Sequence, residues 1–436
     1  MRICFHISNI NRFYTNTNYL LIILNAHRIY FSESINTKLS TRYTSLDFPS
    51  VSFCNMNPLS YARIKTATQF YQIINETANA MNVDISAFAS EIQARTSQDS
   101  TYFNKTGPNP TQDVRTAFQQ RMGWEADQTI YDLSDPPELF LVECSYQGRE
   151  CNRTTEIQRI RDDYFGSCYT FTPTVQRINL PGPGFGLILV FDVNQPDYIP
   201  FVGMFAGVRL AVHGSKFTPS LQGNGFSLAT KFQTDVSLRQ KRINRYPGSD
   251  NSLCDNSNRF EGILACFESC IGDLITVKCE CLFSSQYRKD SVQTICSSDT
   301  DVMCVNEVVA IAANNPTDFC DCRPPCSEIT YENDIFMTSY PSRNYEMVLK
   351  QLLNKTSENM ESFRESLVSV NIYFGSLIED IIDEELAYTT ENFVSDIGGQ
   401  LGFWGGLSIL SMVEVIELII ILIHVCCSPV KTEIQG

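Results

Sequence analysis

The distribution of cysteines restricts the fold of this 436-residue chain more than any other feature. Of the 17 cysteines, 14 lie between Cys54 and Cys326, whereas Cys4, Cys426 and Cys427 lie near the two ends. An even number of cysteines confined to one region predicts seven disulfides that form in an oxidising compartment. We therefore expect a disulfide-stapled extracellular domain over this region.

Zinc binding is the alternative use of the two densest cysteine clusters, "CEC" at Cys279 to Cys281 and "CDCRPPC" at Cys320 to Cys326. Zinc ligands favour two intervening residues, and an extracellular cysteine-rich region favours disulfides, so we expect no metal. With four histidines and no GxSxG, HExxH or GxxxxGK motif, the chain is not expected to be an enzyme or to bind a cofactor.

Glycosylation sequons and charge agree with an extracellular location. The net charge of -16 disfavours nucleic acid as a partner and suits a surface that attracts cations. The four Asn-x-Ser/Thr sequons all lie between the two apolar ends of the chain, at Asn75, Asn104, Asn152 and Asn354.

The two ends differ in their capacity to cross a membrane. Ile409 to Cys427 is a 19-residue apolar run, close to the roughly 20 residues that a spanning helix needs. We predict that it is a transmembrane helix. The best N-terminal candidate has an unbroken apolar core of only six residues, from Tyr19 to Leu24, too short for a convincing span or signal peptide. We expect a degenerate or truncated first span within residues 1–30.

Glu414 and Glu417 lie three residues apart in the C-terminal apolar run. A carboxylate in hydrocarbon costs on the order of 2.5 kcal/mol or more, so both should face protein or water. Several copies of this helix around an axis would form a pore with rings of glutamate that favour cations. The alternative is a packing seam of small residues, which "GFWGGLS" would also provide.

The acidic run from Glu379 to Glu385 is either a solvated face or a vestibule that concentrates cations.

Hydrophobic patterns predict one mixed α+β ectodomain with a β-rich core. Strands are expected at "FPSVSFCNMNP" from Phe48 to Pro58 and at "GFGLILVFDV" from Gly184 to Val193, with two more over residues 207–214 and 367–374. Helices are expected over residues 259–278 and 344–355. No repeat of 20 to 50 residues divides the chain.

Seven motifs follow one another from about Tyr30 to Glu417; examples are "FPSVSFCNMNP", "GSCYTFTP", "CFESCIGDLITVKCEC", "CDCRPPCSEITY" and "SDIGGQLGFWGGLSILSMVEVIE". These motifs resemble, in the same order, those of the degenerin, epithelial sodium channel and acid-sensing ion channel family. The resemblance implies a trimer in the plasma membrane, whose subunits cross the membrane twice around a large clenched-hand ectodomain with thumb, finger and knuckle. It implies an N-terminal segment at 1–30, an extracellular domain at 31–395 with the thumb at about 254–330, a pore-lining second span at 396–427 and a cytoplasmic tail at 428–436.

The resemblance also assigns functional residues by position. The selectivity filter corresponds to Gly406, Leu407 and Ser408. The site where bulky side chains hold family channels open corresponds to Ser395, and the amiloride position corresponds to Gly402. Acidic pore positions correspond to Glu414 and Glu417. The family disulfide pattern implies the pairs Cys54 with Cys168, Cys144 with Cys151, Cys254 with Cys326, Cys266 with Cys322, Cys270 with Cys320, Cys279 with Cys304, and Cys281 with Cys296.

The function implied is a subunit of a sodium-selective, amiloride-sensitive type of cation channel, in a homo- or heterotrimer with family subunits and in contact with membrane lipid. The stimulus stays open among an extracellular peptide ligand, protons and mechanical force. No histidine lies between Tyr30 and Val212, so a proton sensor there would need carboxylates with raised pKa values.

The His-Gly element expected before the first span is absent, since His213-Gly214 lies inside the ectodomain. The alternative is therefore a non-conducting accessory or ligand-binding glycoprotein with the same ectodomain.

Overall fold

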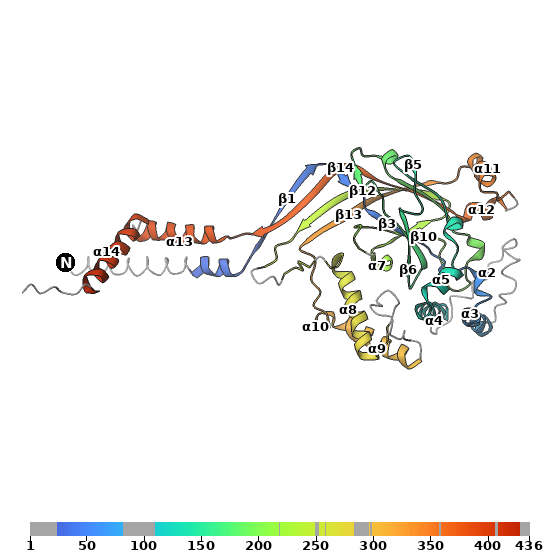
Figure 1. Cartoon of the computed structure of the whole chain (residues 1–436), viewed down its shortest axis with the longest axis horizontal. Helices are drawn as coiled ribbons and strands as arrows, with labels where there is room; N and C mark the ends of the chain where they lie inside the picture. The colour runs from blue at the N-terminus through green and yellow to red at the C-terminus, as the bar shows by residue number, and fades with distance from the viewer. Residues whose placement is uncertain are drawn as a thin grey trace, which may run out of the picture. The chain divides into compact units, whose positions relative to one another are not determined.

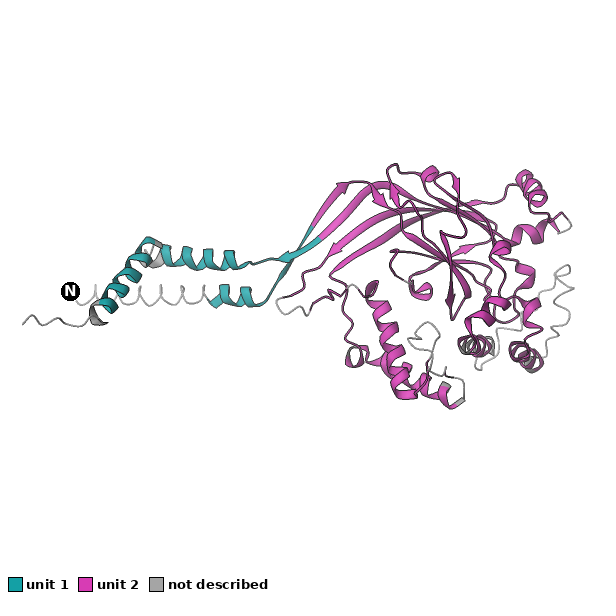
Figure 2. Cartoon of the chain, viewed as in Figure 1, with its two compact units in different colours: residues 1–38, 383–436 teal, residues 39–382 magenta. Residues whose placement is uncertain are grey.

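The structure is a computed structural model that describes residues 24–81, 110–217, 219–248, 253–257, 259–282, 296, 299–356, 359–405 and 409–427. The chain forms two compact units, coloured separately in Figure 2. Unit 1 combines Met1–Lys38 with Asp383–Gly436, and unit 2 is Leu39–Ile382.

Strands and helices alternate irregularly along the chain (Figure 1). The strands are β1 (Ile35–Tyr43), β2 (Leu46–Asp47), β3 (Ser50–Asn55), β4 (Leu141–Tyr146), β5 (Arg149–Glu150), β6 (Ile157–Asp162), β7 (Gly166–Phe171), β8 (Arg177–Ile178), β9 (Leu187–Asp192), β10 (Gly207–His213), β11 (Phe226–Ala229), β12 (Phe232–Asn244), β13 (Ser327–Ser339) and β14 (Leu367–Leu386). The α-helices are α2 (Tyr61–Ile64), α3 (Thr68–Met81), α4 (Pro110–Trp124), α5 (Asp127–Leu133), α6 (Pro137–Phe140), α7 (Leu221–Asn224), α8 (Gly262–Cys279), α9 (Asp299–Asn314), α10 (Pro316–Phe319), α11 (Arg343–Leu352), α12 (Met360–Ser366), α13 (Thr390–Gly405) and α14 (Ile409–Cys427), and residues 24–31 are also helical.

Two sheets form the centre of unit 2. One has the order β13-β12-β14-β9-β4-β5, with β1 also paired to β14, and the other has the order β11-β10-β3-β7-β6. The four strands predicted from the sequence are β3, β9, β10 and β14, and the two predicted helices are α8 and α11. The mixed, disulfide-rich architecture expected from the sequence is confirmed.

Both sheets contribute to one hydrophobic core. The Phe53 ring on β3 lies 5.1 Å from the Phe191 ring on β9 and 5.9 Å from the Tyr169 ring on β7. Phe140 packs against Phe191 at the same centroid distance of 5.1 Å. Aromatic side chains in alternate strand positions therefore join the two sheets, because these positions point into the space between them.

Helices also form smaller cores in unit 2, among them the α3–α4 core and the α8–α9 core. Helices α3 and α4 pack through buried side chains that include Phe70 and Phe118, whose rings lie 5.1 Å apart. Helices α8 and α9 pack through Ile275 and Val308 together with cystine side chains. The second core is small, so its disulfides replace apolar area as a source of stability.

Seven disulfides are present, and they join the same pairs that the family resemblance implies. One links the two central strands β3 and β7, and four link residues of the α8 to α10 region to each other or to the segment after α10. The pairs are Cys54–Cys168, Cys144–Cys151, Cys254–Cys326, Cys266–Cys322, Cys270–Cys320, Cys279–Cys304 and Cys281–Cys296.

Unit 1 joins the two ends of the chain. The Tyr30 ring stacks on the Phe393 ring of α13 at 4.9 Å, and the Ala387 amide donates a hydrogen bond of 2.8 Å to the Ser34 carbonyl oxygen. The helix expected at Ile409 to Cys427 is present as α14. Over the described ranges, no helix combines the length and the apolar character that a membrane crossing requires.

Glu379, the first residue of the acidic run, is buried, so the prediction of a solvated face is wrong for this residue. Its side chain is 1% exposed and accepts hydrogen bonds from Gln240 (2.9 Å), Arg242 (2.8 Å) and Arg42 (3.1 Å). Burial alone would raise the pKa of Glu379, but the bonds from Gln240 and Arg242 outweigh it and lower the pKa. A carboxylate with three donors is stable inside the sheet, whereas an unpaired one would not be.

Candidate functional site

A cavity of about 610 Å³ lies in unit 2 beside the first half of α8. Its walls come from the β6–β7 turn, the segment between β10 and α7, and α8 itself. Four carboxylates line it together with two cations. These ionisable residues are Asp162, Asp163, Lys216, Arg259, Glu261 and Glu268.

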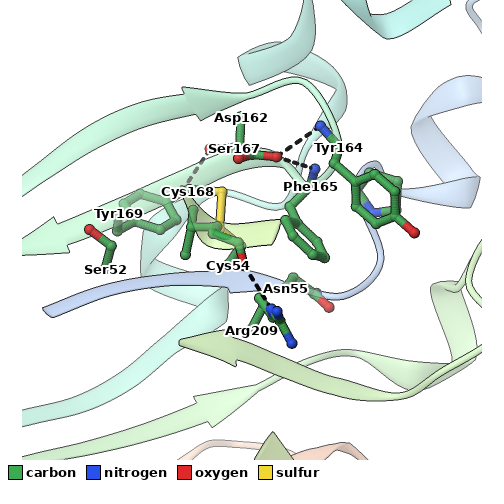
Figure 3. The surroundings of a disulfide bond; sticks show 12 residues. Ser52, Cys54, Asn55, Asp162, Tyr164, Phe165, Ser167, Cys168, Tyr169 and Arg209 are labelled. Atoms are coloured by element: carbon green, nitrogen blue, oxygen red, sulfur yellow. Dashed lines mark hydrogen bonds between the residues drawn. A yellow bond between two sulfur atoms is a disulfide. The ribbon is translucent and has the colours of Figure 1, made fainter. Parts of the chain in front are cut away.

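Asp162 closes the β6–β7 turn. Its Oδ1 accepts hydrogen bonds of 2.8 Å from the backbone amides of both Tyr164 and Phe165, as Figure 3 shows. Aspartate is common in turns because its short side chain bonds to amides two or three residues ahead. Burial raises the pKa of the Asp162 carboxyl to about 6, and the charge of Glu268 adds to the increase. Asp162 is therefore a carboxyl group that gains a proton under mild acidification.

Glu261 immediately precedes α8 and lines the same cavity. Its Oε1 accepts a hydrogen bond of 2.6 Å from the Gly214 amide, which follows β10. Burial raises the pKa of the Glu261 carboxyl to about 7; the Gly214 bond opposes this rise and the Glu328 charge contributes to it. Glu261 therefore changes charge close to neutral pH.

A second contact links α8 to the same wall. Ser220 Oγ donates a hydrogen bond of 2.6 Å to Glu268 Oε1. The carboxylates of α8 thus hold it to the segment between β10 and α7, while Asp162 carries like charge on the neighbouring wall. Protonation of Asp162 would remove its repulsion with Glu268 across the cavity, and protonation of Glu261 would remove its repulsion with Glu328. The arrangement can act as a sensor of protons.

The sequence does not reveal this cavity. Asp162 and Glu261 are about a hundred positions apart, and neither stands in a recognisable motif. The only available signal was the general expectation that buried carboxylates could replace histidine as proton sensors. Sequence spacing could not predict that these residues line one cavity, because that depends on where α8 lies relative to the β6–β7 turn.

The residues predicted for the pore lie in unit 1. Ser395 and Gly402 are on α13, and Glu414 and Glu417 are on α14, where both glutamates are exposed in the single chain. The predicted filter, residues 406–408, lies outside the described residues.

The predicted glycosylation sites lie in unit 2. Asn75, Asn152 and Asn354 are exposed, as acceptors of glycans must be. Asn104 lies outside the described part of the chain.

The chain belongs to the amiloride-sensitive sodium channel family, whose sequence model matches residues 18–418. It is 27% identical over 398 residues to acid-sensing ion channel 1C of Danio rerio, covering 86% of this chain and 70% of that protein. It is 25% identical over 416 residues to acid-sensing ion channel 1 of Gallus gallus, covering 91% and 75%. It is also 25% identical over 477 residues to epithelial sodium channel subunit beta of Homo sapiens, covering 90% and 74%.

These matches confirm the resemblance found in the sequence motifs. The family is one of ion channels, so the expectation that the chain is not an enzyme is also confirmed.

Proposed function

We propose that this chain is a subunit of a trimeric, sodium-selective cation channel of the plasma membrane, of the amiloride-sensitive type, that opens on extracellular acidification. The family match over residues 18–418 carries the proposal of conduction. Protons are favoured as the stimulus by the cavity beside α8, where the pKa values of Asp162 and Glu261 are about 6 and about 7.

In this proposal residues 31–395 are extracellular, residues 396–427 line the pore and residues 428–436 are cytoplasmic. Three copies of Glu414 and Glu417 would form acidic rings around the pore axis, where water and neighbouring helices reduce the cost of charge. The constriction would be formed by residues 406–408, and amiloride would act near Gly402. Asn75, Asn104, Asn152 and Asn354 would carry glycans on the outside.

The cavity supplies a physical basis for opening. Both carboxyls have pKa values above the ordinary values of 3.8 and 4.5, so their neutral forms favour the folded arrangement. The stability that the neutral forms contribute is complete below about pH 4 and is lost as pH rises through the raised pKa values. Acidification from neutral pH thus removes charge from both walls and lets α8 approach the β6–β7 turn.

The pH dependence of current should depend on these two carboxyls. In the double variant Asp162→Asn, Glu261→Gln both groups are neutral at every pH, so the change in current between about pH 5 and pH 8 should be largely lost. The measurement is whole-cell current against external pH. The exposed Glu150→Gln variant is the matched control and should behave like the wild type. A full pH response in the double variant would remove the cavity from the gating mechanism.

A bulky residue at Ser395 tests conduction independently of the stimulus. Ser395→Phe should give a standing sodium current in oocytes expressing the full-length protein, alone or with another family subunit, because it matches the position where bulk holds family channels open. The measurement is current at neutral pH with and without amiloride, and surface labelling verifies delivery. Silence at the surface in both settings would favour the non-conducting accessory protein.

A further inference from the structure

A second cavity, of about 620 Å³, lies in unit 2 among α4, the β6–β7 turn, β10, α7 and β11. Its volume is in the range typical of small-molecule sites. The residues that matter for its chemistry are Arg115, Tyr164, Phe165, Phe205 and Arg209. None of the described residues that line it is a carboxylate, so this cavity has two cationic groups and no anionic one.

The acceptors that hold Arg209 on β10, among the residues that the structure describes, are all neutral. Its Nε donates to the Leu221 carbonyl oxygen (2.8 Å), one Nη to the Gln222 carbonyl oxygen (2.8 Å) and the other to Ser227 Oγ (3.2 Å). These bonds use three of the five N–H donors of the guanidinium. Gly225 leaves room for the group, because a Cβ there would lie 2.8 Å from Arg209 Nε. The chain therefore fixes the position of the charge without neutralising it.

Arg115 on α4 supplies the second cation. Its guanidinium carbon lies 4.6 Å from the centroid of the Tyr164 ring, and Tyr164 packs edge-on against Phe165 at 4.7 Å. Within the described part of the chain, no residue accepts a hydrogen bond from Arg115 or forms an ion pair with either arginine. Burial lowers the pKa of both guanidinium groups, which arginine nevertheless keeps protonated. Among the described residues, therefore, these two partly buried charges have no counter-ion.

An apolar surface adjoins these charges. Phe165 is buried next to the Cys54–Cys168 disulfide, and Figure 3 shows Tyr164 beside it and Arg209 on the strand opposite Cys54. Phe205, just before β10, lines the same cavity and is 60% exposed. Covering the exposed Phe205 ring with an apolar group would remove it from water, which is favourable.

We propose that this cavity binds an organic anion in which a carboxylate adjoins an aromatic group. The planar guanidinium groups match a carboxylate through charge-assisted hydrogen bonds, and the exposed Phe205 ring offers a stacking partner for the aromatic group. Two arginines and no carboxylate among the described lining residues disfavour cationic ligands. This site does not depend on whether the protein conducts ions.

Calorimetric titration of the purified full-length protein in detergent micelles tests the site, with N-acetylphenylalanine as the probe. We expect saturable binding with a Kd below about 1 mM. Arg115→Gln and Arg209→Gln should each weaken it at least about tenfold, the loss expected for a hydrogen bond to a charged group. Arg239→Gln is the control, because Arg239 is an exposed arginine on β12 paired with Asp334. It should leave the Kd unchanged.

Two further probes separate the carboxylate from the ring. N-acetylphenylalaninamide keeps the ring without the charge, and acetate keeps the charge without the ring; both should bind at least about tenfold more weakly than the acid. Equal binding of the amide, or undiminished binding to the Arg115→Gln variant, would overturn the proposal. Far-ultraviolet circular dichroism checks that the variants are folded. If Arg209→Gln does not fold, Arg115→Gln still tests the site, because Arg209 donates three hydrogen bonds to neighbouring segments, whereas Arg115 contacts the β6–β7 turn through the Tyr164 ring. No saturable binding to the wild type up to about 10 mM would also overturn it.

Discussion

Phe53→Ala should lower the free energy of unfolding by about 3 to 5 kcal/mol, the usual cost of removing a fully buried phenylalanine ring. Phe53 is 0% exposed and packs against Phe140, Tyr169 and Phe191, which come from both sides of the core. Alanine would leave a cavity between the two sheets that these fixed rings cannot fill. Urea unfolding of the full-length protein in detergent micelles, followed by circular dichroism, measures the effect.

The matched control is Phe336→Ala on β13, where the phenylalanine is 59% exposed. Substitution at this exposed position should change the free energy of unfolding by about 0.5 kcal/mol or less. Similar losses in the two variants would mean that Phe53 does not lie in the main core.

Removing the disulfide between Cys54 and Cys168 should have an effect of similar size. The bond closes a loop with a sequence separation of 114, for which loop-closure entropy predicts about 5 kcal/mol. Both cysteines are fully buried. The double variant Cys54→Ala, Cys168→Ala removes the cross-link and leaves no free thiol, because both sulfur atoms are absent. Surface delivery and urea unfolding of the non-reduced protein measure the loss.

The Cys144–Cys151 disulfide provides the internal comparison. Its sequence separation is 7, for which the same entropy argument predicts about 2.5 kcal/mol. We therefore expect the double variant Cys144→Ala, Cys151→Ala to be the more stable of the two. The reverse order would show that packing around the sulfur atoms, rather than chain entropy, decides the stability of this core.

The sequence predicts the parts of the fold that depend on local patterns. The run of apolar residues around Leu189 and the alternation around Phe53 give strands, because buried strands need those patterns wherever they pair. The disulfide partners follow from the family motifs and not from spacing alone, since 14 cysteines allow very many pairings.

The candidate site depends on contacts that no local pattern encodes. Glu379 belongs to an acidic run that favours solvent, and only the structure brings Arg42 and Arg242 to it from two other strands. The raised pKa values of Asp162 and Glu261 likewise arise from burial by segments distant in sequence. The two cations of the Arg115 and Arg209 cavity come from α4 and β10, which are far apart in the sequence, so no local pattern predicts that they line one cavity.

The pairing of Glu379 has a consequence for how β14 can move. Successive side chains of a strand point to opposite faces, so a slip of one residue would turn this carboxylate away from Arg242 on β12 and Arg42 on β1. Small sliding displacements would therefore break the ion pairs before new ones could form. Because β14 runs from Leu367 in unit 2 to Leu386 in unit 1, just before α13, displacement of this strand should occur between discrete positions rather than by degrees.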